Sequence, residues 1–374
     1  MKISRRRVAA VAGLSALVLL AGACGSGKSD SNGGGSGSNA ARTEPSRSFT
    51  GPNGETPTAA DQLKLTPEDE AKVKAGNYTA AFVWHESSAL TKAVESGVRA
   101  EFDKLGIKVV ASTSAEFDAA KQANNVQTVL ALKPDAIVTI AVDPTAAAAA
   151  FKPAVDQGVK VVVMTTPPKG FTAGKEIVGI VTVDLTAFGK ANAELIGKAL
   201  GGKGKVGYLY HDADFWFTNQ RDKAFKDWLG YLYPDIEIVE EAGFSDPART
   251  EDIANAMITR NPELKGVYVA WATAAEGVLA AARQNGRNDL KIVTNDLEAN
   301  LAADMVSDGN VVGIVANGST RVGQNLGIVA AYGLLGKKAP ALTVTEPMAA
   351  TKDNIAEAWR DDFGTDAPAE VLKK

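Results

Sequence analysis

Polar side chains and aromatic rings recur directly after short apolar runs in the middle of this 374-residue chain. Carboxylates accept hydrogen bonds, amides and hydroxyls both donate and accept them, and ring faces pack on C–H groups. This mixture suits a small polyhydroxylated ligand, whereas a phosphate site would require several cations among these residues. The candidates are Trp84, His85, Glu86, Ser87, Ser88, Asp143, Thr165, Thr166, residues 211–215, Phe244, Trp271, Asp296 and Asn317.

The same residues offer little for catalysis. The sequence has two histidines and one cysteine, with no HExxH motif, no clustered metal ligands and no serine in a strand-to-helix nucleophile elbow. Asp212 and Asp214 beside His211 could imitate a hydrolase site, but no such serine accompanies them. We therefore predict that the protein is not an enzyme and uses no cofactor and no metal.

Two segments match nucleotide-binding patterns in an unsuitable context. Residues 22–29 fit GxxxxGK[ST], but that loop binds phosphate only between a strand and a helix, and here it adjoins an export signal. Residues 202–207 fit GxGxxG but lead into a predicted strand instead of coming after one. We predict a turn at the second segment and no nucleotide site at either.

The elements that must position the candidates are strands alternating with amphipathic helices. Strict alternation predicts parallel sheets with helices on both faces, which is an α/β, doubly wound architecture. Because about 300 residues are too many for one typical core, we predict two lobes. Ligands bind beyond the carboxyl ends of such strands, where the candidates stand. The predicted strands are 79–84, 107–111, 136–142, 160–164, 206–210, 236–240, 267–270, 292–294 and 311–316.

The first 24 residues predict export and a lipid anchor. Lys2 and the arginines at 5–7 precede residues 8–23, an apolar stretch shorter than the roughly 20 residues of a spanning helix. The stretch ends at Cys24 in Ala-Gly-Ala-Cys, which resembles a bacterial lipobox. We predict a signal peptide over 1–23, a lipid on Cys24 and an extracytoplasmic position at the cell membrane. A signal peptide with an incidental cysteine is the alternative, and Sec and twin-arginine export both stay open.

Charge and composition indicate which partners are disfavoured and which part of the chain beyond Cys24 is folded. The formal net charge is −4, and removing residues 1–23 removes four basic residues, which disfavours nucleic acid as a partner. Residues 25–50 are too rich in Gly, Ser and Asn to bury a core. We predict a flexible tether over 24–76, with one short helix after Thr66, and a folded body from Asn77.

Several short motifs follow one another in the body: residues 101–106, 136–144, Gln220-Arg221 with Phe225, 294–296 and 311–317. With these motifs the body resembles the type I periplasmic binding proteins, in the ribose-binding-like branch of ABC-importer receptors. The resemblance runs from Tyr78 to about Thr351, and each of its motifs is weak alone, but their order and spacing are fairly specific. It implies two lobes joined by a hinge of three crossing strands near Asp184, Asn317 and Glu346, with a solute between them and closure by hinge motion. The implied lobes are 77–183 plus 318–346 and 184–317 plus 347–374.

The resemblance also implies roles for five residues. Asp143 and Asp296 resemble hydroxyl-binding positions of the family, Arg221 resembles its ligand-binding arginine, Phe244 a packing aromatic and Asn317 a hinge amide. Each has a simpler interpretation that stays open. Asp143 could cap a helix that begins at Pro144, Asp296 could cap a helix or form a turn, Arg221 could lie on a solvated helix face, and Asn317 could form a turn.

The sequence also departs from the family. Leu90 and Thr91 replace paired phenylalanines, Ser88 and Trp271 stand where asparagines are expected, Thr165-Thr166 replaces an Asp-Arg pair, and Trp84 adds an indole. Ribose itself is therefore in doubt. Either tryptophan could instead belong to the core, and His85 and His211 could be structural. The predicted ligand-binding residues are Trp84, Ser88, Asp143, Thr165, Arg221, Phe244, Trp271, Asp296 and Asn317.

The resulting prediction is a monomeric, lipid-anchored receptor of an ABC importer that binds a small neutral sugar or polyol and docks on a membrane permease. Two alternatives stay open. The protein could report a bound solute to a membrane signalling partner, or it could bind a small molecule that is not a sugar.

Overall fold

The computed structural model describes residues 43–372, which fall within one compact unit. The predictions of a signal peptide, of lipidation at Cys24 and of the first part of the tether lie outside the described residues. Within residues 43–372, no helix combines the length and apolar character needed to cross a membrane.

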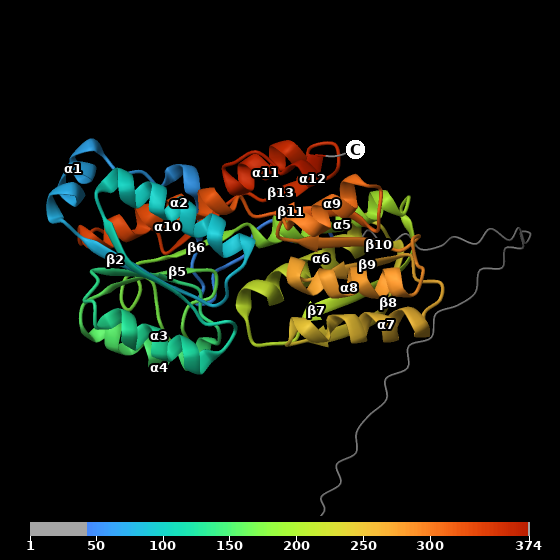
Figure 1. Cartoon of the computed structure of the whole chain (residues 1–374), viewed down its shortest axis with the longest axis horizontal. Coiled ribbons are helices and arrows are strands. Elements are labelled where there is room, and N and C mark those ends of the chain that lie inside the picture. The colour runs from blue at the N-terminus through green and yellow to red at the C-terminus, as the bar shows by residue number, and fades with distance from the viewer. Residues whose placement is uncertain (1–42, 373–374) are drawn as a thin grey trace, which may run out of the picture. The chain divides into compact units, whose positions relative to one another are not determined.

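The first sheet has seven parallel strands in the order β1-β12-β6-β5-β4-β2-β3. Successive side chains of β2 point to opposite faces: Phe82 packs with α2 and α10, and Val83 packs with α3 and α4. Figure 1 shows these two pairs of helices on opposite faces of the sheet. The elements are β1 (Pro57–Ala59), β2 (Thr79–Trp84), β3 (Lys108–Ser114), β4 (Ala136–Thr139), β5 (Lys160–Met164), β6 (Ile180–Val183), β12 (Leu342–Thr345), α1 (Pro67–Gly76), α2 (Ala89–Leu105), α3 (Ala119–Leu130), α4 (Pro144–Asp156) and α10 (Ser319–Leu334).

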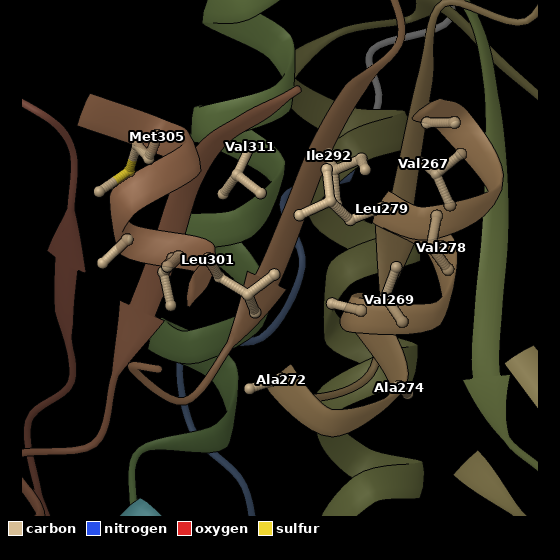
Figure 2. Packing of buried hydrophobic residues seen from close by; sticks show 14 of the residues in the cluster. Val267, Val269, Ala272, Ala274, Val278, Leu279, Ile292, Leu301, Met305 and Val311 are labelled. Carbon is tan, nitrogen blue, oxygen red and sulfur yellow. The ribbon is translucent and has the colours of Figure 1, made fainter. Parts of the chain in front are cut away.

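The second sheet has six strands in the order β13-β11-β10-β9-β7-β8, and all pair in parallel except β13, which is antiparallel to β11. Along β9, Tyr268 packs with α5 and α6, whereas Val267 and Val269 pack with α7, α8 and α9, as Figure 2 shows in part. The elements are β7 (Lys203–His211), β8 (Asp235–Phe244), β9 (Gly266–Val269), β10 (Lys291–Asn295), β11 (Val311–Ala316), β13 (Met348–Ala350), α5 (Leu185–Ala199), α6 (Trp216–Leu232), α7 (Thr250–Arg260), α8 (Ala272–Gln284), α9 (Ala299–Val306), α11 (Ile355–Phe363) and α12 (Ala369–Leu372).

The chain passes between the two sheets three times. It leaves the first sheet after Val183, returns after Ala316 and leaves again after Thr345. These positions adjoin the predicted crossings at Asp184, Asn317 and Glu346, and the predicted fold class is confirmed. The assignment of every residue to one of two lobes stays a prediction.

Side-chain caps start the helices that come after the strands of the first sheet. Ser88, Asp118 and Asp143 accept hydrogen bonds from N–H groups in the first turns of α2, α3 and α4. Gly106 ends α2 with a φ of 69°, a left-handed conformation that glycine adopts without strain. The loops between strand and helix are thereby held at the carboxyl edge of the sheet.

Part of the segment predicted as tether forms regular structure. Strand β1 pairs with β12, and α1 begins after Thr66, where the single short helix was predicted. Leu63 and Val73 are buried in the apolar cluster under α2 and α10. Lys337 donates to Asp69 over 2.6 Å, which adds a polar contact to this packing. The sequence did not predict that this segment packs on the folded body, because it has few apolar residues. Two buried apolar side chains are nevertheless enough to hold it there.

Candidate functional site

A cavity of about 230 Å³ lies between the carboxyl ends of the two sheets. Pockets for drug-sized ligands span roughly 300–1,000 Å³, so this cavity suits a smaller molecule. The loops after β2, β3, β4 and β5 form one wall, and the loops after β7, β8, β9, β10 and β11 form the other. The lining is His85, Glu86, Leu90, Phe117, residues 140–144, Met164, Thr165, His211, residues 213–215, Phe217, Thr218, Ser245, Pro247, Trp271, Asp296 and Asn317.

The two walls touch each other beside the cavity. The backbone N–H of Phe217, in α6, donates to the hydroxyl of Thr166, after β5, over 3.3 Å. Thr166 belongs to the first sheet's loops and Phe217 to a helix of the second sheet, so this bond joins the two walls. The described arrangement is therefore one in which the cavity is partly enclosed.

Acidic side chains dominate the charge of the lining. Its four carboxylates are those of Glu86, Asp143, Asp214 and Asp296, and it includes no lysine or arginine among the described residues. Burial in the first place, and then the negative charge of Asp296, raise the pKa of Glu86 to about 7. A lining this negative favours a neutral or cationic ligand, whereas an anionic ligand would be repelled.

Both histidines of the lining are neutral at physiological pH. Burial lowers the pKa of His85 to about 4. Burial, helped by the nearby charge of Arg221, lowers the pKa of His211 to about 4 as well. Each neutral imidazole therefore offers one donor and one acceptor nitrogen.

Aromatic rings line both walls. The ring of Trp271 meets His211 edge to face at 5.0 Å and packs against Phe244 at 4.7 Å. On the opposite wall the ring of His85 meets Phe117 edge to face at 5.2 Å. Such rings can pack on the C–H faces of a ligand.

Three residues of the lining hold buried polar atoms without a hydrogen-bond partner in the described protein. These atoms are Nδ1 of His85, Oγ1 of Thr165 and Nε1 of Trp271. Buried polar groups are rarely left unpaired, so these three atoms at one cavity are available to pair with a ligand. Thr165 also has a φ of 69°, an unusual conformation for a β-branched residue and one that is found most often at functional sites.

Asp296 accepts one hydrogen bond and lies within the field of a buried arginine. The side-chain amide of Asn317 donates to its Oδ1 over 2.6 Å. Burial raises the pKa of Asp296, and the positive charge of Arg221 opposes that shift. Arg221 is itself buried behind the lining, where its guanidinium lies 5.0 Å from the ring of Phe217 and donates to the Ala270 carbonyl oxygen. Arg221 thus acts on the cavity through Asp296.

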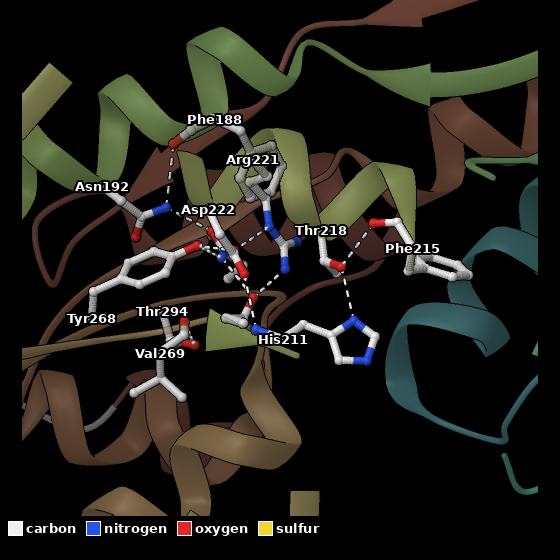
Figure 3. A network of polar contacts seen from close by, with 12 residues as sticks. Phe188, Asn192, His211, Phe215, Thr218, Arg221, Asp222, Tyr268, Val269 and Thr294 are labelled. Carbon is white, nitrogen blue, oxygen red and sulfur yellow. Dashed lines mark hydrogen bonds and ion pairs between the residues drawn. The ribbon is translucent and has the colours of Figure 1, made fainter. Parts of the chain in front are cut away.

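A buried polar network supports this wall, as Figure 3 shows. The Tyr268 hydroxyl donates to Asp222 over 2.6 Å, and the backbone N–H of His211 donates to the same carboxylate over 3.1 Å. The Asn295 amide donates to the Ala270 carbonyl over 2.7 Å, and so shares that acceptor with Arg221. The network therefore fixes the ends of β7 and β9 relative to Arg221.

The structure brings five of the nine predicted residues to the cavity. Asp143, Thr165, Trp271, Asp296 and Asn317 line it. Asp143 also caps α4, with its Oδ1 2.6 Å from the Ala146 nitrogen, so the two interpretations of this residue coexist.

The other four predicted residues do not line the cavity. Trp84 stacks on Phe82 in the core and donates to Glu95 over 2.7 Å, because its position in β2 turns it toward α2. Ser88 forms a capping box at the start of α2. Phe244 lies behind Trp271, and Arg221 lies behind Asp296.

Phe117 and Phe217 line the cavity without having been predicted. Strand β3 ends at Ser114, three residues beyond the predicted end at 111, and Phe117 lies in the loop after it. A correct strand end would have made it a candidate. Phe217 is in the first turn of α6, and its neighbour Phe215 was a candidate from the same loop.

No group of three or more His, Cys, Asp and Glu side chains in the described part of the chain is arranged to hold a metal ion. The four carboxylates of the lining are spread over both walls.

A family of known proteins matches most of this chain in sequence. A sequence model of the family described as "Periplasmic binding protein domain" matches residues 80–339. No curated protein sequence matches the chain.

Solved structures with the same fold are numerous. An ABC transporter solute-binding protein of Agrobacterium vitis, bound with α-D-tagatopyranose, is 23% identical, with a TM-score of 0.70 over 78% of this chain and 100% of that one. One from Mycobacterium smegmatis, with bound glycerol, is 22% identical, with a TM-score of 0.66 over 75% and 96%. A carbohydrate transporter solute-binding protein of Agrobacterium radiobacter, in complex with D-arabinose, is 23% identical, with a TM-score of 0.67 over 77% and 98%. At these identities the likeness shows the fold alone.

Proposed function

The chain belongs to the periplasmic binding protein domain family, and from this premise we propose that it is the solute-binding protein of an ABC importer. Its ligand is a small sugar or polyol. The observation that carries this proposal is the cavity between the two sheets, in which rings and unpaired polar atoms of the described residues surround a space without lysine or arginine. The sugars and the glycerol bound by the three similar structures support the same class of ligand.

Each wall contributes a different part of recognition. The Trp271 ring packs on a C–H face of the ligand, and its Nε1 donates to a hydroxyl. Asp143 and Asp296 accept from hydroxyls, and Thr165 both donates and accepts. Asn317 holds Asp296 in place and the charge of Arg221 favours its ionised form, so both act on affinity through that carboxylate.

Ligand binding stabilises the partly enclosed arrangement. A solute held by both walls adds contacts that the separated walls lack, so it shifts the hinge toward closure. Closure presents both lobes together to the membrane permease. The lipid on Cys24 keeps this monomer at the outer side of the cell membrane, where the solute is captured.

A ligand screen tests the proposal. The full chain in detergent is heated with monosaccharides, polyols, nucleosides and amino acids, each in a separate sample. A ligand at 100 times its dissociation constant adds about 2.7 kcal/mol, which raises the thermal midpoint by roughly 2–4 °C. Stabilisation by a sugar or polyol, together with loss of its uptake from cells that lack the chain, supports an importer receptor. Stabilisation by nucleosides or amino acids alone overturns the ligand class, and normal uptake overturns the importer role.

A further inference from the structure

The cavity gathers negative charge that the protein does not balance. Glu86 lies on the first wall and Asp296 on the second, and Asp296 is close enough for its charge to raise the pKa of Glu86 across the cavity. Arg221 offsets Asp296 from behind. Glu86 forms no ion pair with a lysine or arginine of the described residues, its other charged neighbours are Glu116 and Glu298, Ser88 hydrogen-bonds to it, and the imidazole of His85, 3.6 Å away, is neutral.

Hydrogen-bond acceptors surround the same place. Thr165 is only 4% exposed, lines the cavity and has an unpaired hydroxyl. Asp296 uses Oδ1 for Asn317, which leaves Oδ2 for a ligand. An ammonium group has three donors and no acceptor, so it matches this set better than a hydroxyl does.

Rings complete the match. Phe117 is 42% exposed although it is a large apolar side chain, and it stands beside His85 at the cavity. Phe215 and Trp271 line the other wall. A cation near such ring faces is stabilised further, most strongly when it is withdrawn from water.

We propose that the ligand carries a basic nitrogen held between Glu86 and Asp296, so that the site selects amino or imino sugars over their neutral and acidic counterparts. This inference rests on the proposed function, since it assumes a sugar-like ligand in the same cavity. It makes Glu86 the residue that determines specificity. The rings and hydroxyl partners already described then recognise the rest of the ligand.

Calorimetry of the full chain in detergent tests the selection with matched probes. The pairs are D-glucosamine with D-glucose, D-galactosamine with D-galactose, and 1-deoxynojirimycin with 1,5-anhydro-D-glucitol, and D-glucuronate is the acidic probe. At least one amine should bind about 10- to 100-fold more tightly than its neutral counterpart, as expected for one added charge-assisted hydrogen bond. D-glucuronate should not bind.

Two variants locate the effect. Glu86→Gln should reduce the affinity for the amine to that of the neutral sugar, and Glu86→Asp should retain part of the preference. Glu237→Gln is the matched control, because Glu237 is exposed on β8, away from the cavity, and its loss should leave both affinities unchanged. Thermal melts of each variant establish that it is folded.

Proton release gives a second readout. The pKa of Glu86 is about 7 in the free protein, and a bound cation lowers it. Amine binding at pH 7 should therefore release a fraction of a proton from Glu86, in addition to any proton that the amine itself exchanges, seen as a difference from Glu86→Gln in how the binding enthalpy changes with the ionisation enthalpy of the buffer. Glu86→Gln should abolish this release.

The outcomes separate the two proposals. Neutral sugars that bind as tightly as their amines, or a preference that survives Glu86→Gln, overturn the selection but retain the sugar receptor. A folded protein that binds neither the amines nor the neutral probes overturns the proposed function, and the selection with it.

Discussion

Asp143→Ala should weaken both helix stability and ligand binding, whereas Asp143→Ser should restore the stability alone. The Asp143 carboxylate has two tasks in the structure: Oδ1 accepts from the Ala146 nitrogen over 2.6 Å, and the residue lines the cavity. Pro144 occupies the first helical position after it, so the backbone is already set for capping. Serine can cap as well as aspartate, but it lacks the second oxygen and the charge.

The two losses have different expected sizes. Removing the cap costs about 1 kcal/mol of folding free energy, which lowers the thermal midpoint by about 2 °C. Removing a charged acceptor costs about 1.5–3 kcal/mol of binding free energy, which weakens affinity roughly 10- to 150-fold. The assays are thermal melts without ligand and calorimetry with the tightest ligand of the screen.

Thr66→Ala is the matched control. Thr66 caps α1 by accepting from the Asp69 nitrogen over 3.2 Å, and it does not line the cavity. This variant should lose stability and keep its affinity. The reasoning about Asp143 is refuted if Asp143→Ala binds normally, since the residue is then only a cap, or if Asp143→Ser recovers full affinity.

Arg221→Met should destabilise the protein by about 3 kcal/mol or more in urea denaturation, because it leaves the buried carboxylates of Asp222 and Asp296 without their cation; a loss below about 1 kcal/mol would contradict this. Burial raises the pKa of Asp362 in the folded state to about 6. The folded state therefore binds more protons than the unfolded state between about pH 4 and 6, so the free energy of unfolding should fall as the pH rises through this range. Asp362→Asn, which can still accept from Ser319, should flatten that part of the stability profile, and an unchanged slope in pH-dependent melts would refute the assignment. Trp84→Phe should lower the thermal midpoint without changing affinity, whereas Trp271→Leu should weaken binding about tenfold or more, and calorimetry would refute this pairing if the two effects were exchanged.

The sequence predicted the fold because alternation of strands and helices is a local pattern. It also named Asp143, Trp271 and Asp296 as candidates that line the cavity in the structure, since each stands at the end of an apolar run that becomes a strand. Trp84, which was predicted to bind ligand and could alternatively belong to the core, is the last residue of its strand and faces the core. A shift of one residue along a strand turns a side chain from one face of the sheet to the other, and so can move it between the core and the cavity.

Other parts of the site depend on contacts that no local pattern encodes. Asn192 donates to Asn295 across 103 residues, and Tyr268 reaches Asp222 across 46. Neither pair has a spacing that would predict it. Likewise β1 could not be assigned from three residues, because its strand geometry is imposed by pairing with β12, far away in the sequence.

The three crossings between the sheets also determine the order in which the molecule can assemble. In the first sheet, β1 is connected to β6 only through β12, and the Thr345 hydroxyl donates to the Thr182 carbonyl across 163 residues. The strands β7 to β11 form one uninterrupted stretch, so the second sheet can gather most of its strands while the first still lacks β12. The entropy cost of closing a loop rises only slowly with its length, so the long loop between β6 and β12 costs little extra free energy. It should nevertheless slow folding, because β12 must find β6 before their contacts can stabilise the sheet. We therefore expect β12 to join the first sheet late in folding, together with the pairing of β13 in the second sheet, in the step that establishes the hinge.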